Sequence, residues 1–314
     1  MYKRIILILI SIFVLAIAIG QCTNDDEYVN DESLQNTFVD DNKSLANIEH
    51  SKEITDQNPS PKKELDLNEM PKGQPNAKIA VEHGVPKLET PRIINAMPEQ
   101  ILSRLGYSLS YNNTTKCANW VAWHLTKEHT DGPWSRKGTR YFEDTEASKP
   151  RQELVDWGQN PNGLDHGHMC PAGDNKWSKQ AMEQTYLLTN ICPQNRKLNG
   201  GDWKELEEKC RKWAKEYGDI YIACGPMYYN EKKSTIGGSK EIWVPDAFYK
   251  VVLCMKETPK AIGFIYPNEG RDHPMSYYAC SVDNIESKTD IDFFYNLPDD
   301  IEVVVETQNN INGW

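Results

Sequence analysis

Residues 163–177 read GLDHGHMCPAGDNKW, and the two histidines in this stretch decide between different folds and chemistries. His166 and His168 alternate with Gly167, a pattern typical of a short strand on which both rings point to the same side. The glycine between them lets another group approach the backbone closely. Cys170 continues the alternation, so the stretch predicts either metal ligands or a catalytic base whose partners lie elsewhere in the chain.

A zinc hydrolase is one interpretation of this stretch, with His166, His168 and Cys170 as the ligands, because nitrogen and sulfur are the donors that Zn²⁺ prefers. Catalytic zinc sites normally add ligands from a second motif, and the other histidines of this chain are scattered singly. Another interpretation is a structural disulfide through Cys170 with no catalysis at all. On the residues alone these alternatives stay open.

The residues around the stretch predict one α+β domain over 91–314. Apolar runs rich in β-branched and aromatic residues are typical of strands in a largely antiparallel sheet, and they occupy 106–112, 119–125, 220–229, 248–256 and 261–267. Two flanking helices are expected between these groups, at 178–188 and 201–218. Strands, then helices, then strands without a regular βαβ period indicate the α+β class.

The first ninety residues differ from this domain. Residues 1–21 predict a signal peptide, because Lys3 and Arg4 precede about fifteen apolar residues. Either an ordinary peptidase removes this run, or Cys22 is lipidated and tethers the chain to a membrane, or the run stays as an anchor. The expected location is therefore outside the cytoplasm, as a secreted, periplasmic or cell-envelope lipoprotein. Residues 22–90 are too polar to bury a core and predict a disordered acidic linker.

The net charge of −11 is unevenly distributed. Residues 21–90 carry about −8 and residues 281–314 about −7, whereas residues 91–280 carry about +2. The central region is thus compatible with a polyanionic partner, although its charge is too small to predict one. Beyond Cys22, seven cysteines remain, an odd number that cannot pair completely within one molecule.

Several further motifs follow the opening stretch along the chain. Together with Asp165-His166-Gly167-His168, they resemble the DNA/RNA non-specific endonuclease family, whose signature is Asp-Arg-Gly-His. The resemblance covers about residues 101–299. The further motifs are PAGDNKWSKQAM (171–182), YLLTNICPQNRKLNGGDWKELE (186–207), IYIACGP (220–226), VPDAFYKVV (244–252) and IESKTDIDFFYNLP (285–298).

The resemblance implies the ββα-metal, or His-Me finger, nuclease fold and a catalytic site of five residues. His168 is the general base, Asn199 binds one Mg²⁺ or Mn²⁺ per active site directly, and Glu207 steadies that ion through water. Arg140 contacts the scissile phosphate and stabilises the charge of the transition state. His166 stands where the family usually has arginine, and we expect it to contact substrate or a neighbouring carboxylate.

These roles agree with elementary chemistry. An imidazole with a pKa near 6.5 is mostly neutral at neutral pH and can take a proton from water. Mg²⁺ prefers oxygen ligands such as that of Asn199, so His168 acts as a base and not as a ligand. An arginine fork suits a phosphate. The implied activity is hydrolysis of DNA and RNA to 5′-phosphates without sequence specificity, with binding that weakens as salt increases.

The sequence leaves two alternatives to this activity open. One is the zinc hydrolase already described. The other is a catalytically weak surface lipoprotein that binds nucleic acid, in which the Asp-His-Gly-His change has reduced turnover. Whether the domain forms a homodimer stays open.

Overall fold

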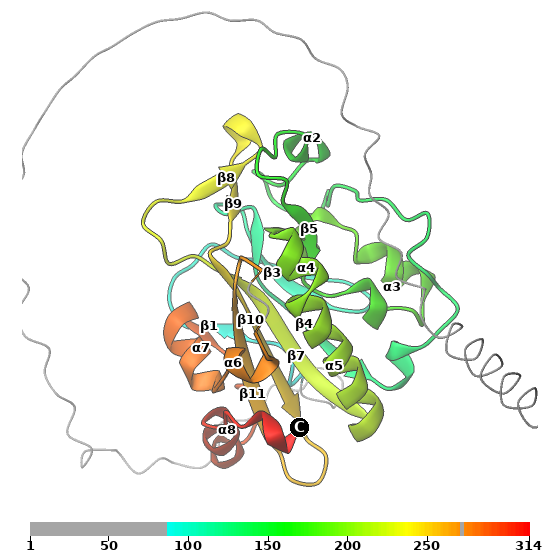
Figure 1. Ribbon diagram of the computed structural model, residues 1–314, viewed down its shortest axis with the longest axis vertical. Coiled ribbons are helices and arrows are strands. Elements are labelled where there is room, and N and C mark those ends of the chain that lie inside the picture. The colour runs from blue at the N-terminus through cyan, green and yellow to red at the C-terminus, as the bar shows by residue number, and fades with distance from the viewer. Residues whose placement is uncertain (1–86, 271–272) are drawn as a thin grey trace, which may run out of the picture. The chain divides into compact units, whose positions relative to one another are not determined.

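A seven-stranded sheet with antiparallel neighbours throughout forms the centre of the chain (Figure 1). The computed structural model describes residues 87–270 and 273–314, which belong to one compact unit. The expected signal peptide, Cys22 and nearly all of the expected linker lie outside the described residues. In spatial order the strands are β12 (Ala279–Cys280), β11 (Lys260–Pro267), β10 (Ala247–Cys254), β7 (Asp219–Met227), β4 (Cys117–Thr126), β3 (Ser108–Asn112) and β2 (Gln100–Ser103).

Strand β10 shows why the sheet is buried on both faces. Phe248 and Val252 join one hydrophobic cluster, whereas Tyr249, Val251 and Leu253 join a second cluster on the opposite face. Side chains alternate between the faces of a strand, so a nearly continuous apolar run serves two cores at once. The sequence-based strands are confirmed, and the two N-terminal ones, β3 and β4, pair as an antiparallel hairpin.

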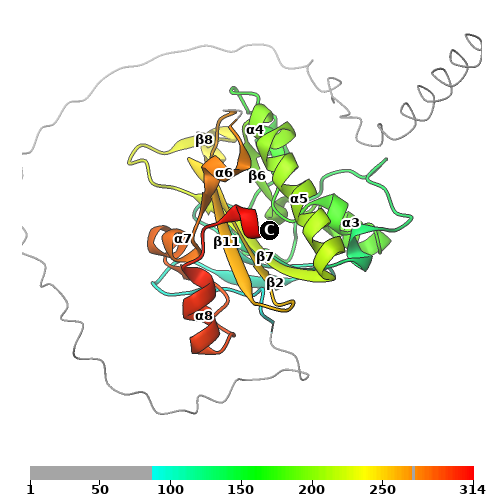
Figure 2. The same cartoon turned by 60° about the horizontal axis from the view of Figure 1, so that its bottom comes forward.

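Helices cover the two faces separately (Figure 2). The long helix α5 (Asp202–Tyr217) and the short α3 (Lys179–Gln184) lie on one face, and α7 (Val282–Thr289) and α8 (Asp299–Glu306) lie on the other. Helix α5 follows the expected boundaries and buries Trp203, Leu206 and Trp213 against the sheet. The predicted helix at 178–188 is shorter than expected, although Ser178 caps it by accepting from the Ala181 NH at 3.3 Å. The α+β prediction is thus confirmed.

Three small two-stranded sheets and three further short α-helices lie outside the central sheet. The sheets pair β1 (Arg92–Ile93) with β13 (Ile291–Asp292), β5 (Asp165–His168) with β6 (Ile191–Gln194), and β8 (Ser234–Ile236) with β9 (Ile242–Val244). The helices are α2 (Leu154–Trp157), α4 (Arg196–Gly200) and α6 (Met275–Tyr278).

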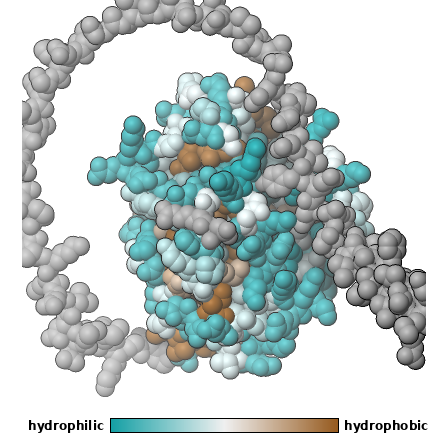
Figure 3. Space-filling view, in the orientation of Figure 1, coloured by the Kyte–Doolittle hydropathy of each residue, from teal (hydrophilic) through white to brown (hydrophobic). Residues whose placement is uncertain are grey.

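The surface drawn in Figure 3 is mainly hydrophilic, and its hydrophobic patches are small. Across the described residues, no helix combines the length and the apolar character that a membrane crossing requires.

Candidate active site

Two antiparallel strands and the helix that follows them bring the sequence-predicted histidines and Asn199 into one unit. Strand β5 pairs with β6 so that Gly167 faces Cys192, and α4 begins two residues after β6 and packs against β5. Asn195 caps α4, because its side-chain oxygen accepts from the NH of Lys197 at 2.9 Å. We call β5, β6 and α4 the ββα unit.

Gly167 allows the close approach that the sequence predicts. A β-carbon built on it would lie 2.4 Å from Gln194 Oε1 and 2.6 Å from Gln194 Cβ, which no side chain could occupy. Gln194 is fully buried at the end of β6. Glycine is therefore needed between the two histidines for β6 to pack on β5.

His166 lies in an aromatic slot. Its ring stacks on Tyr141 at 4.3 Å between centroids and on Trp157 at 3.8 Å, with interplanar angles of 17° and 20°. Burial lowers the pKa of His166 to about 4, against the opposing charge of Asp165. At the position where the family usually has an arginine, the chain thus places a neutral, stacked ring.

His168 lies two residues further on the same side of β5. Its ring packs against Tyr186 in a T-shaped arrangement, with 4.9 Å between the ring centroids. Its Nε2 is buried without a hydrogen-bond partner among the described residues. Burial, followed by the positive charge of Arg136, lowers the pKa of His168 to about 3, while a hydrogen bond to the His166 backbone acts in the opposite direction. The ring is therefore neutral at neutral pH, as a base must be before it accepts a proton.

Asp165 positions Asn199 on α4. The Asn199 amide nitrogen donates to Asp165 Oδ2 at 3.1 Å, and Arg196 Nε donates to Asp165 Oδ1 at 3.0 Å. An amide whose nitrogen is held in this way offers its oxygen for metal ligation. Asn199 belongs to the short helix α4 and not to α5, and Gly201 separates the two helices. A β-carbon on Gly201 would lie 2.6 Å from the Lys197 carbonyl oxygen.

Glu207 lies about one and a half turns into α5 and is half-buried. Burial raises the pKa of Glu207 to about 7, although the nearby charges of Lys250 and Arg211 lower it. Arg211 is held by a 3.0 Å ion pair with the buried Asp174. Lys250 is fully buried in β10, with its ammonium nitrogen 4.3 Å from the ring centroid of Trp203. Glu207 thus interacts with the positive charges of Lys250 and Arg211.

Arg140 lies at the surface of the loop that precedes Tyr141, the aromatic partner of His166. The arginine whose charge acts on His168 is Arg136, four residues earlier in the same loop. Both arginines are exposed. The loop therefore supplies two guanidinium groups in the neighbourhood of the ββα unit, of which sequence reasoning identified one.

The zinc interpretation is not supported by this geometry. A shared metal ion needs at least three histidine, cysteine or acidic side chains whose ligand atoms lie close together. In the described part of the chain only one such group exists, on α7 and α8. It contains none of His166, His168 and Cys170. Cys170 is completely buried, where its sulfur accepts from Asn175 Nδ2 at 3.3 Å. All seven cysteines of the described chain are free thiols, so Cys170 forms no structural disulfide either.

The donors of the predicted metal site suit a hard cation. Asn199 supplies an amide oxygen and Glu207 a carboxylate, and oxygen donors of this kind match Mg²⁺ or Mn²⁺ and not zinc. Mg²⁺ keeps several of its waters, which agrees with a site that has few direct protein ligands. The residues present therefore fit the divalent ion that the resemblance implies.

Comparison with known proteins tests the expected family directly. A family model described as DNA/RNA non-specific endonuclease matches residues 89–300. The chain is 33% identical over 210 residues to the mitochondrial nuclease EXOG of Xenopus laevis, covering 62% of this chain and 58% of that protein. It is 33% identical over 213 residues to nuclease C1 of Cunninghamella echinulata var. echinulata, covering 62% and 83%.

The mitochondrial endonuclease G of Bos taurus is a further relative, 27% identical over 216 residues, covering 63% of this chain and 70% of that protein. Among solved structures, the EndoG/EndoGI complex aligns with a TM-score of 0.60 and 25% identity, covering 64% of this chain and 87% of the solved one.

These relatives correct one prediction from the sequence. The expected secreted, periplasmic or cell-envelope location is contradicted, because the matched relatives are for the most part named mitochondrial nucleases. The apolar N-terminal run that suggested export lies outside the described residues. The chain spans a little over half the length of the EXOG relatives that it matches.

The expected fold is confirmed by the same comparisons. The antiparallel sheet with its flanking helices aligns with EndoG, and the ββα unit holds the Asp-His-Gly-His stretch on β5. The family model spans more than half of the chain and includes every residue of the candidate site. The chain therefore belongs to the DNA/RNA non-specific endonuclease family, with the ββα-metal fold.

Proposed function

We propose that residues 91–314 form a metal-dependent endonuclease that hydrolyses the phosphodiester bonds of DNA and RNA without sequence specificity. The observation that carries the proposal is the ββα unit, in which a neutral His168 with an unpartnered Nε2 and an Asn199 oriented by Asp165 lie on adjoining elements. The relatives named nucleases agree with it.

His168 is the proposed general base. Its ring accepts a proton from a water molecule, whose oxygen then attacks the phosphorus while the bond from phosphorus to the 3′ oxygen breaks. The products are a 5′-phosphate and a 3′-hydroxyl, the latter after protonation by solvent. In the free protein, burial makes His168 a weak base, with a pKa of about 3. The negative charge of a bound phosphate opposes this effect, so the substrate itself strengthens the base.

Asn199 is the proposed direct ligand of one divalent ion, and Glu207 orients that ion's waters. When bound, Mg²⁺ neutralises a phosphate oxygen and stabilises the departing oxygen. Asp165 keeps the Asn199 amide nitrogen turned toward itself, which directs the oxygen to the metal. Arg211 and Lys250 favour the ionised form of Glu207, since both of their charges lower its pKa.

The positively charged loop before Tyr141 is the proposed phosphate clamp. Arg140 contacts the scissile phosphate, and Arg136 adds a second positive charge beside His168. We propose that His166, whose two ring faces are stacked on Tyr141 and Trp157, contacts the substrate through the edge of its ring and supplies no fixed charge. Phosphate contacts carry no sequence information, which agrees with non-specific cleavage.

The test is cleavage of supercoiled plasmid and of a structured RNA by the full chain, in MgCl₂, MnCl₂, ZnCl₂ or EDTA. We expect both substrates to be cut in MgCl₂ or MnCl₂, EDTA to abolish cutting, and the new ends to carry 5′-phosphates that a phosphatase removes. Cleavage that only ZnCl₂ supports, or binding without cleavage in every metal, would contradict the proposal. The oligomeric state, which sequence reasoning left open, is measured by light scattering on the same preparation.

A further inference from the structure

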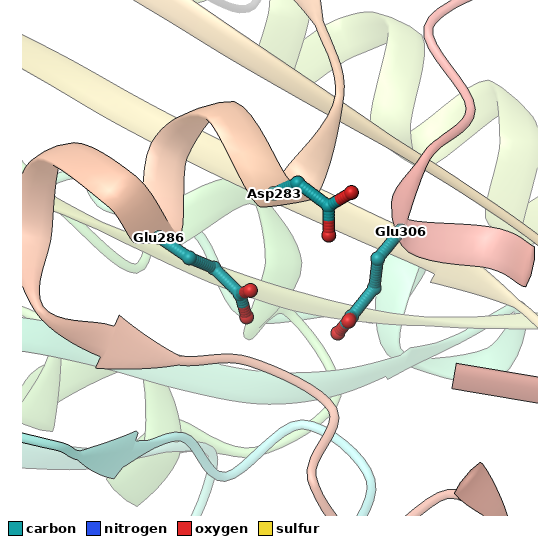
Figure 4. A group of neighbouring side chains, drawn as sticks. All are labelled: Asp283, Glu286 and Glu306. Carbon is teal, nitrogen blue, oxygen red and sulfur yellow. The ribbon is translucent and has the colours of Figure 1, made fainter. Parts of the chain in front are cut away.

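Three carboxyl groups converge between α7 and α8, on the sheet face opposite α5 (Figure 4). Asp283 and Glu286 lie three residues apart on α7, which places them on one side of that helix. Glu306 comes from the last residue of α8. One oxygen atom of each lies within 4.8 Å of the others. We call these three residues the carboxylate cluster.

Glu306 gives the cluster a feature that acidic surface groups lack. The residue is only 6% exposed, and its Oε1 is buried without a hydrogen-bond partner among the described residues. Figure 4 shows its carboxyl group pointing toward Asp283 and Glu286. A buried carboxylate with an unsatisfied oxygen is costly unless a cation or a proton compensates it.

The other two members are positioned for a shared ligand. Glu286 Oε1 accepts from the Phe293 NH at 2.7 Å, which fixes the direction of its carboxyl group. Asp283 is exposed in the first turn of α7, so the cluster is open to solvent on that side. Solvent access gives an ion a path of entry and leaves room for water ligands.

The side chains around the carboxylate cluster add negative charge that favours the binding of a cation. Burial and the neighbouring carboxylates raise the pKa of Glu306 to about 9 and that of Glu286 to about 7. Glu302 and Asp292 add further negative charge, and Arg92, the nearby arginine, is engaged in an ion pair with Asp292. A divalent cation would balance this charge more completely than one shared proton.

We propose that the carboxylate cluster binds a Ca²⁺ ion that fastens α8 to α7. Ca²⁺ takes six to eight oxygen ligands at about 2.3–2.6 Å in a flexible shell, which suits three carboxylates supplied by two different helices. Mg²⁺ demands a near-ideal octahedron and gives up its waters reluctantly, so it suits a cage of three protein carboxylates less well. The cluster lies across the sheet from α5, so this site is independent of the proposed active site.

The experiment is isothermal titration of CaCl₂ into the full chain carrying Asn199→Ala, which removes the direct ligand of the active-site ion. We expect one Ca²⁺ per chain and a rise in melting temperature with CaCl₂. Asp283→Asn and Glu306→Gln should each raise the Kd at least tenfold. The matched control is Glu302→Gln, which removes the same charge from α8 outside the cluster and should change the Kd less than threefold.

Three results would overturn the proposal. One is a titration in which CaCl₂ releases or takes up no binding heat and leaves the melting temperature unchanged, which would mean that a shared proton alone compensates Glu306. A second is a loss of Ca²⁺ affinity in Glu302→Gln as large as that in Glu306→Gln, which would mean that only the overall negative charge of α8 matters. The third is MgCl₂ binding more tightly than CaCl₂. Because Asp283 is exposed, Asp283→Asn tests the site even where Glu306→Gln perturbs the packing of α8.

Discussion

Replacing His166 by phenylalanine should flatten the pH dependence of the protein's stability. In the unfolded chain the ring has a pKa near 6.5, whereas burial between Tyr141 and Trp157 lowers it to about 4 in the native state. The unfolded state therefore binds the proton more readily. The stability that this ring contributes is complete above pH 6.5 and is lost as the pH falls toward 4.

The magnitude follows from these two pKa values. Between pH 7.5 and pH 5, one histidine with this shift reduces the free energy of unfolding by about 2 kcal/mol. For a domain of this size the loss corresponds to about 4–8 °C in melting temperature. Phenylalanine keeps the stacked ring and removes the titration, so the variant should lack this share of the acid destabilisation.

The assay is urea unfolding of the full-length wild type and of His166→Phe at pH 7.5 and pH 5. The difference between the proteins at pH 7.5 measures packing, and the change in that difference at pH 5 measures titration. Carboxyl groups with raised pKa values, such as Glu207, shift the stability of both proteins and cancel. Unfolding free energies that fall in parallel for the two proteins would refute the reasoning that His166 is buried and neutral.

Further predictions concern the ββα unit and the substrate. Gly167→Ala should destabilise the protein by about 1–3 kcal/mol in urea unfolding, because its β-carbon overlaps Gln194; an unchanged midpoint would contradict this. Asn199→Ala should reduce Mg²⁺-stimulated cleavage at least 100-fold, since one metal ligand is lost, and full activity at saturating Mg²⁺ would oppose its role. Arg140→Gln and Arg136→Gln should each reduce the magnitude of the slope of log DNA affinity against log salt concentration by about 1. The slope is measured by DNA binding in EDTA, and unaltered slopes would exclude phosphate contacts by these arginines.

Much of the fold could be predicted because its signals are local. The apolar strands are bounded by Gly, Pro or Asn, and the stripe of Trp203, Leu206 and Trp213 has the helical period. The alternation of His166 and His168 predicted a strand, which β5 confirms. What local patterns could not reveal was the break at Gly201, which depends on a close contact with the Lys197 carbonyl.

The candidate site was harder to predict where partners are distant in sequence. Asp165 and Asn199 are 34 residues apart, and only the folded chain joins them. Arg211 had a usable signal, since it lies one helical turn after Glu207. Lys250 had another, because a lysine inside an apolar strand needs a compensating partner. The location was misjudged because it was inferred only from the basic and then apolar order of the N-terminal residues, which lie outside the described part of the chain.

The central claim, that His168 is the general base of a phosphodiester hydrolase, is tested most directly by single-turnover cleavage of a DNA duplex in MgCl₂. We compare the wild type with His168→Ala and with His124→Ala, a control outside the ββα unit that removes the ring bound to Asp219 at 2.8 Å. The account predicts a loss of about 10²–10⁴-fold for His168→Ala and none for His124→Ala, with both variants shown to be folded by their cooperative melting. Cleavage by His168→Ala within a few-fold of the wild-type rate would contradict it.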